Sequence, residues 1–306
     1  MLTLLAKRLV QCVLILFGVA AITFVLLYAL PADPARMLAG RSATAQTVEN
    51  IRRELGLDQP LPVQFAHYVG GLVQGDLGRS YAQKTEVVTL IAARLPATLT
   101  LMAAGIVIEV LLGVLLGSIA ALKRGGLVDR IVMMSAFVGV SAPQFVVALL
   151  LLYVFAATLG WFPMSGYGSA AHVVLPAATL GILGAGWYAR MVRSAMIDVL
   201  NQDYIRTARA KGLSAARVTL RHVLPNAILP IIAMIGIDIG QFMGGVVVVE
   251  AVYGWPGIGQ LAWQAIQQVD IPIIMGVTLT SALAIILGNL VADLVAPVID
   301  PRIRTQ

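Results

Sequence analysis

The chain has 306 residues, of which 59% are hydrophobic and only 12% are charged, and its formal net charge is +6. Its mean hydropathy is +0.90. A soluble globular chain carries about 25% charged residues, so this composition excludes a soluble domain and predicts an all-α integral membrane protein. The positive charge follows the loops, as described below, and therefore does not indicate nucleic-acid binding.

Six segments are apolar and long enough to form transmembrane helices, since about 20 apolar residues cross a hydrocarbon layer of about 30 Å. They lie near residues 9–30, 98–122, 131–159, 172–190, 227–252 and 272–297. The first is longer than the apolar region of about 7–15 residues in a signal peptide. We therefore expect it to be retained as the first helix, with cleavage as the alternative.

The connection between the first two spans, residues 31–97, is too long for a simple loop. Its turn signals predict a small ordered cap outside the membrane, with a flexible loop as the alternative. The expected features are a helix over Thr47–Leu55 stopped by Gly56, a helix over Val63–Val73, a tight turn at GDLGRS (75–80), and Pro96 near the first turn of the second span. This divides the chain into 1–97, the first span plus cap, and 98–306, a five-helix core.

Outside the 31–97 segment, lysine and arginine gather at alternate ends of the predicted spans. They precede the first span (Lys7 and Arg8), cluster at 123–130 and 191–226, and follow the last span, whereas the loops 160–171 and 253–271 contain none. By the positive-inside rule both termini and the 191–226 loop are predicted to be cytoplasmic. The charged 31–97 segment does not change this, because long loops translocate largely regardless of charge.

Aromatic residues are expected at both membrane interfaces, where amphipathic rings are favoured. At predicted outer ends these are Tyr28, Trp161, Phe162, Tyr253 and Trp255, and at an inner end Trp187 and Tyr188.

The predicted cytoplasmic loop contains DYIRTARAKGLSAARVTLRHVLPNAILP (203–230), a basic stretch between two apolar spans. It indicates two short helices joined at a glycine. Asp203 is expected to cap the first, and Gly212 suits the left-handed residue beyond its end. Ser214 is expected to cap the second, which should run until Pro225 removes a backbone donor. Such a rigid element predicts a binding surface for a cytoplasmic partner.

Polar residues within the spans are candidates for a transport path. Asp238 and Gln241 lie on a different face of the fifth span from a Gly236–Gly240–Gly244 stripe that favours close helix packing. An acidic residue in mid-span is costly and should face a cavity or a partner. The sixth span has a polar stripe of Thr278, Ser281, Asn289 and Asp293, of which Thr278, Ser281 and Asn289 are also candidates. The alternative is polar packing between helices. Glu109, alone in the second span, is expected to have a structural role.

The sequence offers no catalytic, cofactor-binding or metal-binding constellation. It lacks the phosphate-binding pattern G-x-x-x-x-G-K-[ST]. Its histidines, His67, His172 and His222, are far apart and lack the spacing of a zinc site. The single cysteine, Cys12, cannot form an intrachain disulfide. We therefore expect a subunit that is not an enzyme.

The basic loop resembles the signature of ATP-binding-cassette importer permeases, in which Glu-Ala-Ala, three residues, Gly and nine residues precede Ile-x-Leu-Pro. Here Arg206-Thr207-Ala208 stands for the triplet, Gly212 is at the expected offset, and His222-Val223-Leu224-Pro225 closes the motif. Arg206 and His222 depart from the general pattern, as in the dipeptide/oligopeptide/nickel branch. Further blocks resemble that branch in order: LPADPAR (30–36), LGLDQPLPVQF (55–65), GDLGRS, RLPATLTL (94–101), HVVLPAATLG (172–181), EAVYGWPGIGQL (250–261) and DPRIR (300–304).

The resemblance implies a type I importer transmembrane domain with six transmembrane helices in the bacterial inner membrane. It also implies a second homologous permease subunit, two cytoplasmic ATPase subunits and an extracytoplasmic substrate-binding protein, and it places an outer gate near Tyr253 and Trp255. Trp255 would plug the outer mouth or anchor the interface. ATPase docking is expected at Tyr204, Arg206, Thr207, Ala208, Arg209, Ala210, Lys211, Gly212, Leu213 and Ser214. The alternative is contact of this basic loop with anionic lipid headgroups.

The family resemblance leaves the cargo open. Di- or oligopeptides are the expected class, and nickel, glutathione or a haem-related ligand are alternatives within the family. A secondary transporter is the second functional class, although it would usually show an internal repeat with paired broken helices. A membrane-embedded enzyme or sensor is the third.

Overall fold

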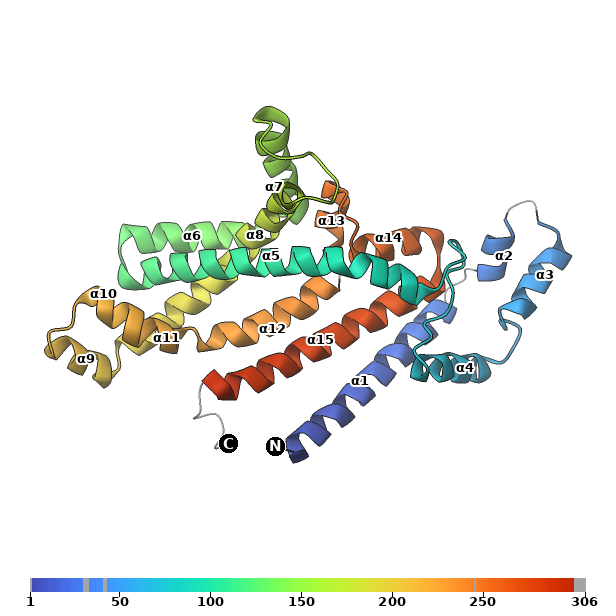
Figure 1. The fold of residues 1–306 in the computed structure, drawn as a ribbon, viewed down its shortest axis with the longest axis horizontal. Coiled ribbons are helices and arrows are strands. Elements are labelled where there is room, and N and C mark those ends of the chain that lie inside the picture. Colours follow the sequence, from blue (N-terminus) through green and yellow to red (C-terminus); the bar gives the residue numbers. More distant parts are fainter. Residues whose placement is uncertain (1, 30–32, 41–42, 245, 300–306) are drawn as a thin grey trace. The chain divides into compact units, whose positions relative to one another are not determined.

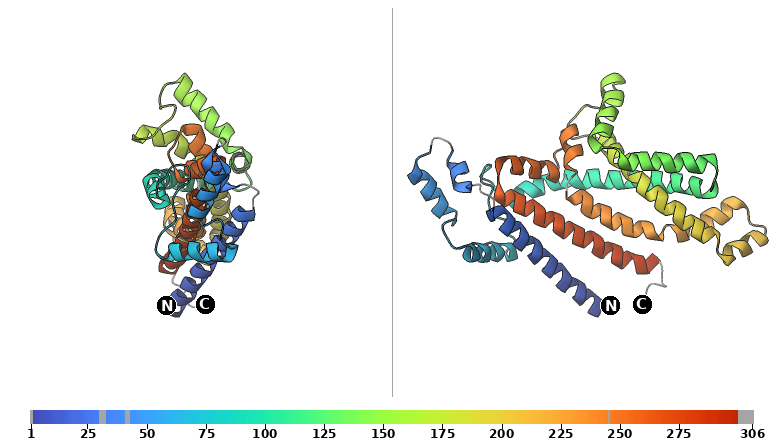
Figure 2. Two further views of the ribbon diagram at one scale, coloured as in Figure 1. Left: turned by 90° about the vertical axis from the view of Figure 1, so that its right-hand side faces the viewer. Right: turned by 180° about the vertical axis from the view of Figure 1, so that it is seen from behind.

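The computed structural model describes residues 2–29, 33–40, 43–244 and 246–299. Within these residues the chain is helical, which confirms the all-α prediction, and its only β pairing is an isolated bridge between Arg79 and Glu86 (Figures 1 and 2). Residues 30–32 of LPADPAR and the whole of DPRIR lie outside the described residues, as do the side chains of Lys7, Arg8 and Tyr28.

The chain forms two compact units. Unit 1 comprises Met1–Thr98, Met243–Val247 and Pro256–Ile286, and unit 2 comprises Leu99–Phe242, Val248–Trp255 and Leu287–Gln306. The helices of unit 1 are α1 (Leu2–Ala29), α2 (Pro34–Ala39), α3 (Ala45–Glu54), α4 (Leu61–Val73), the start of α5 (Val87–Leu122), α14 (Ile258–Gln268) and the first part of α15 (Ile271–Ile299).

The predicted cap segment is helical over most of its described length. Helices α3 and α4 confirm the two expected helices, and Gly56 between them has a left-handed φ of 66°. Helix α4 packs on α1, because the rings of Phe65 and Tyr68 lie 5.2 and 6.1 Å from that of Phe24. Pro96 lies well inside α5 rather than in its first turn, since that helix begins at Val87.

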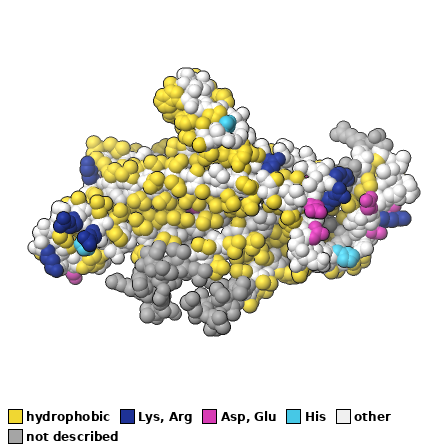
Figure 3. All heavy atoms as spheres, in the orientation of Figure 1, with side chains coloured by type: hydrophobic (Ala, Val, Ile, Leu, Met, Phe, Trp, Pro, Cys, Tyr) yellow, Lys and Arg dark blue, Asp and Glu magenta, His cyan; other side chains and the backbone are white. Residues whose placement is uncertain are grey.

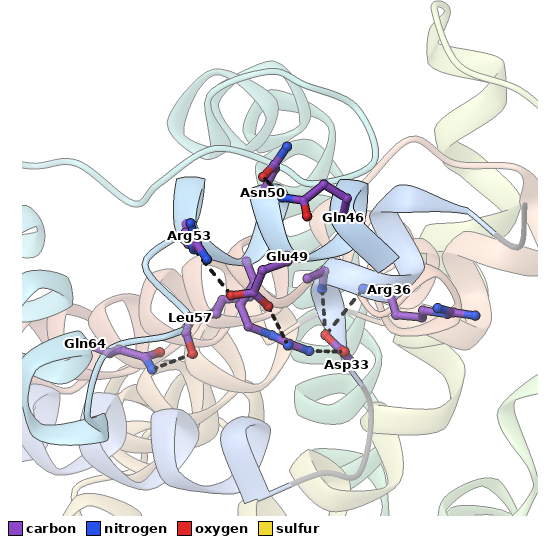
Figure 4. A network of polar contacts seen from close by, with 10 residues as sticks. Asp33, Arg36, Gln46, Glu49, Asn50, Arg53, Leu57 and Gln64 are labelled. Atoms are coloured by element: carbon purple, nitrogen blue, oxygen red, sulfur yellow. Dashed lines mark hydrogen bonds and ion pairs between the residues drawn. The ribbon is translucent and has the colours of Figure 1, made fainter. Parts of the chain in front are cut away.

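A polar network joins α2 to α3 (Figure 4). Asp33 caps α2 by accepting from the backbone N–H groups of Ala35 and Arg36 at 3.1 and 3.3 Å. Arg52 of α3 donates to the same carboxylate at 2.5 Å and to Glu49 at 3.2 Å. Partly exposed ion pairs contribute about 0–1 kcal/mol each, so this network fixes the geometry of the helix pair more than it stabilises the fold.

Asp270 directly precedes α15 and is fully buried. Its side chain holds the turn that follows α4 in place. Its carboxylate accepts from the Ser80 hydroxyl at 2.6 Å and from the backbone N–H groups of Tyr81 and Ala82 at 3.2 and 2.9 Å. Two chain segments about 190 residues apart are thereby held together by one side chain.

We expect Asp270→Ala to release this turn, because hydrogen bonds to a charged group contribute about 1.5–3 kcal/mol each. Limited proteolysis should show faster cleavage between residues 74 and 86. Asp76→Ala is the matched control, since exposed Asp76 accepts only a local bond from the Gly78 N–H at 2.7 Å. Equal cleavage of the two variants would contradict the role given to Asp270.

The helices of unit 2 include the remainder of α5, then α6 (Leu127–Ser141), α7 (Gln144–Leu151), the π-helical turn η1 (Leu152–Thr158), α8 (Ala170–Leu200), α9 (Asp203–Ala210), α10 (Ala215–Val218), the π-helical turn η2 (Thr219–Val223), α11 (Leu224–Ala227), α12 (Leu229–Met243) and most of α13 (Val247–Tyr253). Helices α5 and α6 form an antiparallel hairpin (Figures 1 and 2). Small residues let α5 and α8 approach closely: a Cβ added at Gly117 of α5 would lie 2.6 Å from the Ala189 carbonyl oxygen of α8.

Two of the predicted spans are broken. Within 131–159, α6 and α7–η1 meet at 104°. The cause is Pro143, because the residue before a proline is disfavoured in the helical region, and Ala142 is extended at ψ 134°. Within 227–252, α12 ends at Met243 and α13 begins at Val247. A further 47° bend precedes α12, where Pro230 lacks a backbone N–H.

Among the described residues, three helices are long and apolar enough to cross a membrane unbroken: α5, α8 and α15 over Ile271–Val291. The two bent pairs raise the number to five. Large apolar side chains are exposed along α5 and α6, including Leu111, Leu115 and Phe137. Hydrophobic side chains also cover much of the face seen in Figure 3. Such a surface fits contact with lipid.

Candidate functional site

The basic loop folds largely as its sequence predicts. Helix α9 is followed by Gly212, whose φ of 77° is the left-handed conformation expected there. Ser214 caps α10 by accepting from the Arg217 N–H at 3.4 Å. Two details differ. Asp203 does not cap α9, because it is the first helical residue after Gln202. The second helix also continues past Pro225 to Ala227, since a π-helical turn at Thr219–Val223 adjusts the backbone bonding before the proline.

One face of α9 is anchored in the core of unit 2. Ile205 and Ala208 are buried in a cluster that contains Met196 of α8 together with Val218 and Val223. Ala208 is therefore covered by this chain, and its side chain does not belong to an exposed docking face. The result is a short helix held on a rigid base.

The opposite face of α9 and the turn after it are exposed. Lys and Arg side chains gather at this end of unit 2 (Figure 3). Leu213 is half-buried, and the predicted docking residues that lie at the surface are Tyr204, Arg206, Thr207, Arg209, Ala210, Lys211, Gly212 and Ser214. Arg206 forms a wholly exposed pair with Asp203 at 3.6 Å, which contributes little to stability. This face is free to bind a partner.

A second basic segment, the α5–α6 turn, lies against the end of α8 that leads into the loop. Arg193 of α8 donates from Nε and Nη2 to the two carboxylate oxygens of Asp129 at 2.6 and 2.7 Å. Asp129 also accepts from the Gly125 N–H at 2.8 Å and is buried. This bidentate pair was not predicted from the sequence, and it holds two predicted cytoplasmic segments together.

The predicted path residues of the fifth span, Asp238 and Gln241, lie on α12 beside Glu109 of α5 and Tyr188 of α8. The Tyr188 hydroxyl donates to Asp238. Glu109 and Asp238 line the same two cavities. The close approach of α5 and α8 is essential here, because a Cβ at Gly184 would overlap the Glu109 carboxyl group.

Two cavities of about 230 and 210 Å³ adjoin these side chains. Both are lined by Glu109, Gly184, Trp187, Asp238 and Gln241. We call them together the acidic pocket. The structural role expected for Glu109 is thus incomplete, because its carboxyl group also borders a cavity. Tyr188 is buried at 1% exposure, so its predicted place at the membrane interface is wrong.

The predicted path residues of the sixth span do not line the acidic pocket. Thr278 donates to the Ile274 carbonyl of its own helix at 2.8 Å, and Ser281 donates to the Met243 carbonyl at 3.1 Å. Asn289 is exposed. These contacts fit the alternative of polar packing for Thr278 and Ser281.

The predicted gate residues are buried rather than placed at a lipid interface. The Tyr253 hydroxyl donates to the Ala148 carbonyl at 3.2 Å and lies 2.9 Å from the Thr179 hydroxyl. Trp255 is 0% exposed and meets the Tyr167 ring edge-on at 4.9 Å. Interface anchoring by these two aromatic residues is therefore wrong. The contact between Tyr167 and Trp255 brings together the two loops that lack lysine and arginine.

Metal ligation finds no support in the described part of the chain, where no group of three or more His, Cys, Asp or Glu could hold an ion. His172 contacts Ser169 at 2.8 Å.

Comparison with known families identifies the class of protein. Residues 113–305 match the family described as the inner membrane component of binding-protein-dependent transport systems, and residues 1–102 match the N-terminal family of such membrane components. The chain belongs to this family, as a permease of the dipeptide/oligopeptide/nickel branch of ATP-binding-cassette importers. It is a multi-pass protein of the bacterial inner membrane.

Individual relatives match almost end to end. The chain is 43% identical over 304 residues to the glutathione transport system permease protein GsiC of Escherichia coli strain K12, covering 99% of each. It is 42% identical to the protein of the same name from Salmonella choleraesuis strain SC-B67, again over 99% of each. Among solved structures, an inward-facing MetNI methionine ABC transporter chain matches with a TM-score of 0.56 and 18% identity, covering 69% of this chain and 96% of that one. This last similarity supports the fold alone.

Proposed function

We propose that the chain is one of two permease subunits of an ATP-driven importer and crosses the membrane six times with both termini in the cytoplasm. Contacts within unit 2 support this topology. The Arg193–Asp129 pair joins the two basic segments. At the loops without lysine or arginine, the Gly166 N–H donates to the Tyr253 carbonyl at 3.0 Å. Segments predicted to share a side of the membrane are thus neighbours.

The main support for the proposal is that α9 has one exposed basic face and one face buried in the core of unit 2. A coupling element must be accessible to its partner and rigidly joined to the spans. Buried Ile205 and Ala208 provide the join, and Arg206, Arg209 and Lys211 provide a surface for acidic groups of an ATPase subunit. Residues 1–97 form the first span and outer cap, and residues 98–306 form the core with the 191–226 coupling loop.

ATP hydrolysis takes place in two separate cytoplasmic subunits, and an external binding protein delivers the substrate. The path includes Asp238, Gln241 and Asn289, while Thr278 and Ser281 serve polar packing, and the outer gate includes Tyr253 and Trp255. The substrate class is peptides. The names of the relatives favour glutathione, itself a tripeptide, as one specific cargo. Nickel, haem-related ligands and secondary transport have no comparable support.

The proposal predicts that charge reversal on α9 releases the ATPase. The complex would be expressed with its partner subunits and purified through a tag on this chain. Arg206→Glu/Arg209→Glu should lose the co-eluting ATPase and ATP-driven uptake, while the chain remains in the membrane because both side chains are exposed.

The matched control is Arg217→Glu/Arg221→Glu, which makes the same change of charge at two exposed residues outside the docking set. It should retain the ATPase. Equal loss in both double variants would favour contact with anionic lipid instead. Absence of an ATPase even with the wild-type chain would reopen the secondary-transporter alternative.

A further inference from the structure

The acidic pocket holds two carboxyl groups whose charge is not balanced by any cationic side chain that the structure describes. Within the described residues, neither Glu109 nor Asp238 forms an ion pair with a lysine, arginine or histidine. The guanidinium of Arg190 lies over the Trp187 ring at 4.3 Å, and Arg190 does not line the pocket. Acidic groups within spanning helices are costly unless they are paired. A positive group from outside the chain would complete the site.

The hydrogen bonding leads to the same requirement. An ionised carboxylate only accepts hydrogen bonds. Asp238 already accepts from Tyr188, and Glu109 lines the same cavities without an accepting role filled at Oε2. Glu109 is 4% exposed, and its Oε2 accepts no hydrogen bond. A buried acceptor left without a donor beside a cavity points to a ligand that carries donors.

We propose that the acidic pocket binds the primary ammonium group at the amino end of the transported peptide. An ammonium has three donors, and the pocket offers three acceptors in the side chains of Glu109, Asp238 and Gln241. This proposal rests on the proposed import of peptides and adds the chemical feature by which this subunit recognises its cargo.

The dimensions of the pocket fit one end of a peptide. Sites for whole drug-sized ligands are about 300–1,000 Å³, and the larger of these two cavities is about 230 Å³. Its remaining walls are mostly apolar, with Val140, Leu180, Leu183 and Phe242 among them. They suit the first side chain of a peptide without selecting one residue type. The rest of the substrate would extend toward the second permease subunit.

The test uses the complete purified transporter without nucleotide or binding protein. Binding of radiolabelled dialanine would be measured at concentrations up to about 10 mM, with N-acetyl-dialanine and sodium chloride as separate competitors. The free amine is the only group that the acetylated probe lacks. We expect saturable binding of dialanine, no competition by N-acetyl-dialanine, and no competition by sodium against a choline chloride reference.

The variants Glu109→Gln and Asp238→Asn keep the shape of the pocket but remove its charge. Each should weaken dialanine binding by about tenfold or more, while Gln144→Glu, which adds a carboxylate to the lining of the larger cavity, should bind at least as well as wild type. Retention of the ATPase in every variant separates failure of this inference from failure of the proposed function.

Three results would overturn the inference. The first is no saturable binding of dialanine by the wild-type complex, which would leave the carboxyl pair to hold a proton alone. The second is equal competition by the acetylated probe, and the third is displacement by sodium, which would make this an inorganic cation site. These competition results require no variant, so a folding defect in Glu109→Gln or Asp238→Asn would not protect the proposal.

Discussion

Arg193→Ala is expected to be among the most destabilising single substitutions in unit 2. The Asp129 side chain is 6% exposed and would remain buried without its cation. Removing one partner of a buried ion pair costs about 3–5 kcal/mol. The Arg193 side chain is 27% exposed, so solvent should moderate the loss toward the lower end. Heat-induced aggregation of the purified protein should begin at a clearly lower temperature than for wild type.

A matched pair of variants distinguishes this effect from a general loss of positive charge. Arg206→Ala removes an arginine whose partner Asp203 is 3.6 Å away and whose side chain is 83% exposed. Such pairs contribute about 0–1 kcal/mol, so its unfolding should resemble wild type. Adding Asp129→Asn to Arg193→Ala should recover part of the lost stability, because the uncompensated charge disappears. Equal effects of Arg193→Ala and Arg206→Ala would contradict the structural role of the pair.

The fold of the basic loop could be predicted because residues that end or cap helices mark its two helices. Gly212 and Ser214 act on neighbouring backbone groups, and such effects follow from the order of the residues alone. The anchoring of Ala208 could not be predicted in this way. Ala208 was expected on the docking face, but its partners Met196 and Val223 come from other helices.

The broken spans show where hydropathy is insufficient. Apolar composition predicts that a segment enters the membrane, but it contains no information about direction. Pro143 was visible near the middle of the 131–159 segment, and its effect on Ala142 could have indicated the bend. The break after Met243 has its own signal in Gly244, which is interpreted above only as part of a small-residue stripe.

Pairs of residues distant in sequence were the least predictable part of the candidate site. Asp238 was selected because an acidic residue in mid-span needs a partner, and this reasoning succeeded without identifying the partner. Glu109 and Tyr188 lie on two other helices, so no local spacing relates them to Asp238. The same limitation applies to Asp129 and Arg193, whose side chains are 64 residues apart in the chain. One carboxylate alone indicates only that a partner exists.

Gly117→Val is expected to prevent α5 and α8 from packing. A Cβ at this position would lie 2.6 Å from the Ala189 carbonyl oxygen and 2.8 Å from the Val192 Cβ. Overpacking a core costs about 1–3 kcal/mol, and the cost here should reach or exceed the upper end because backbone atoms cannot rotate away. We expect a severe loss of folded protein from the membrane fraction, measured by size-exclusion chromatography after mild detergent extraction.

Gly18→Val in α1 is the control, because a Cβ at Gly18 meets nothing within 4 Å in this chain. The change from glycine to valine is the same and also lies within an apolar helix, so general effects on insertion cancel. Normal yields of both variants would show that α5 and α8 can separate without unfolding unit 2. Selective loss of Gly117→Val would establish that folding requires the close packing of α5 on α8, the two helices that carry Glu109 and Tyr188.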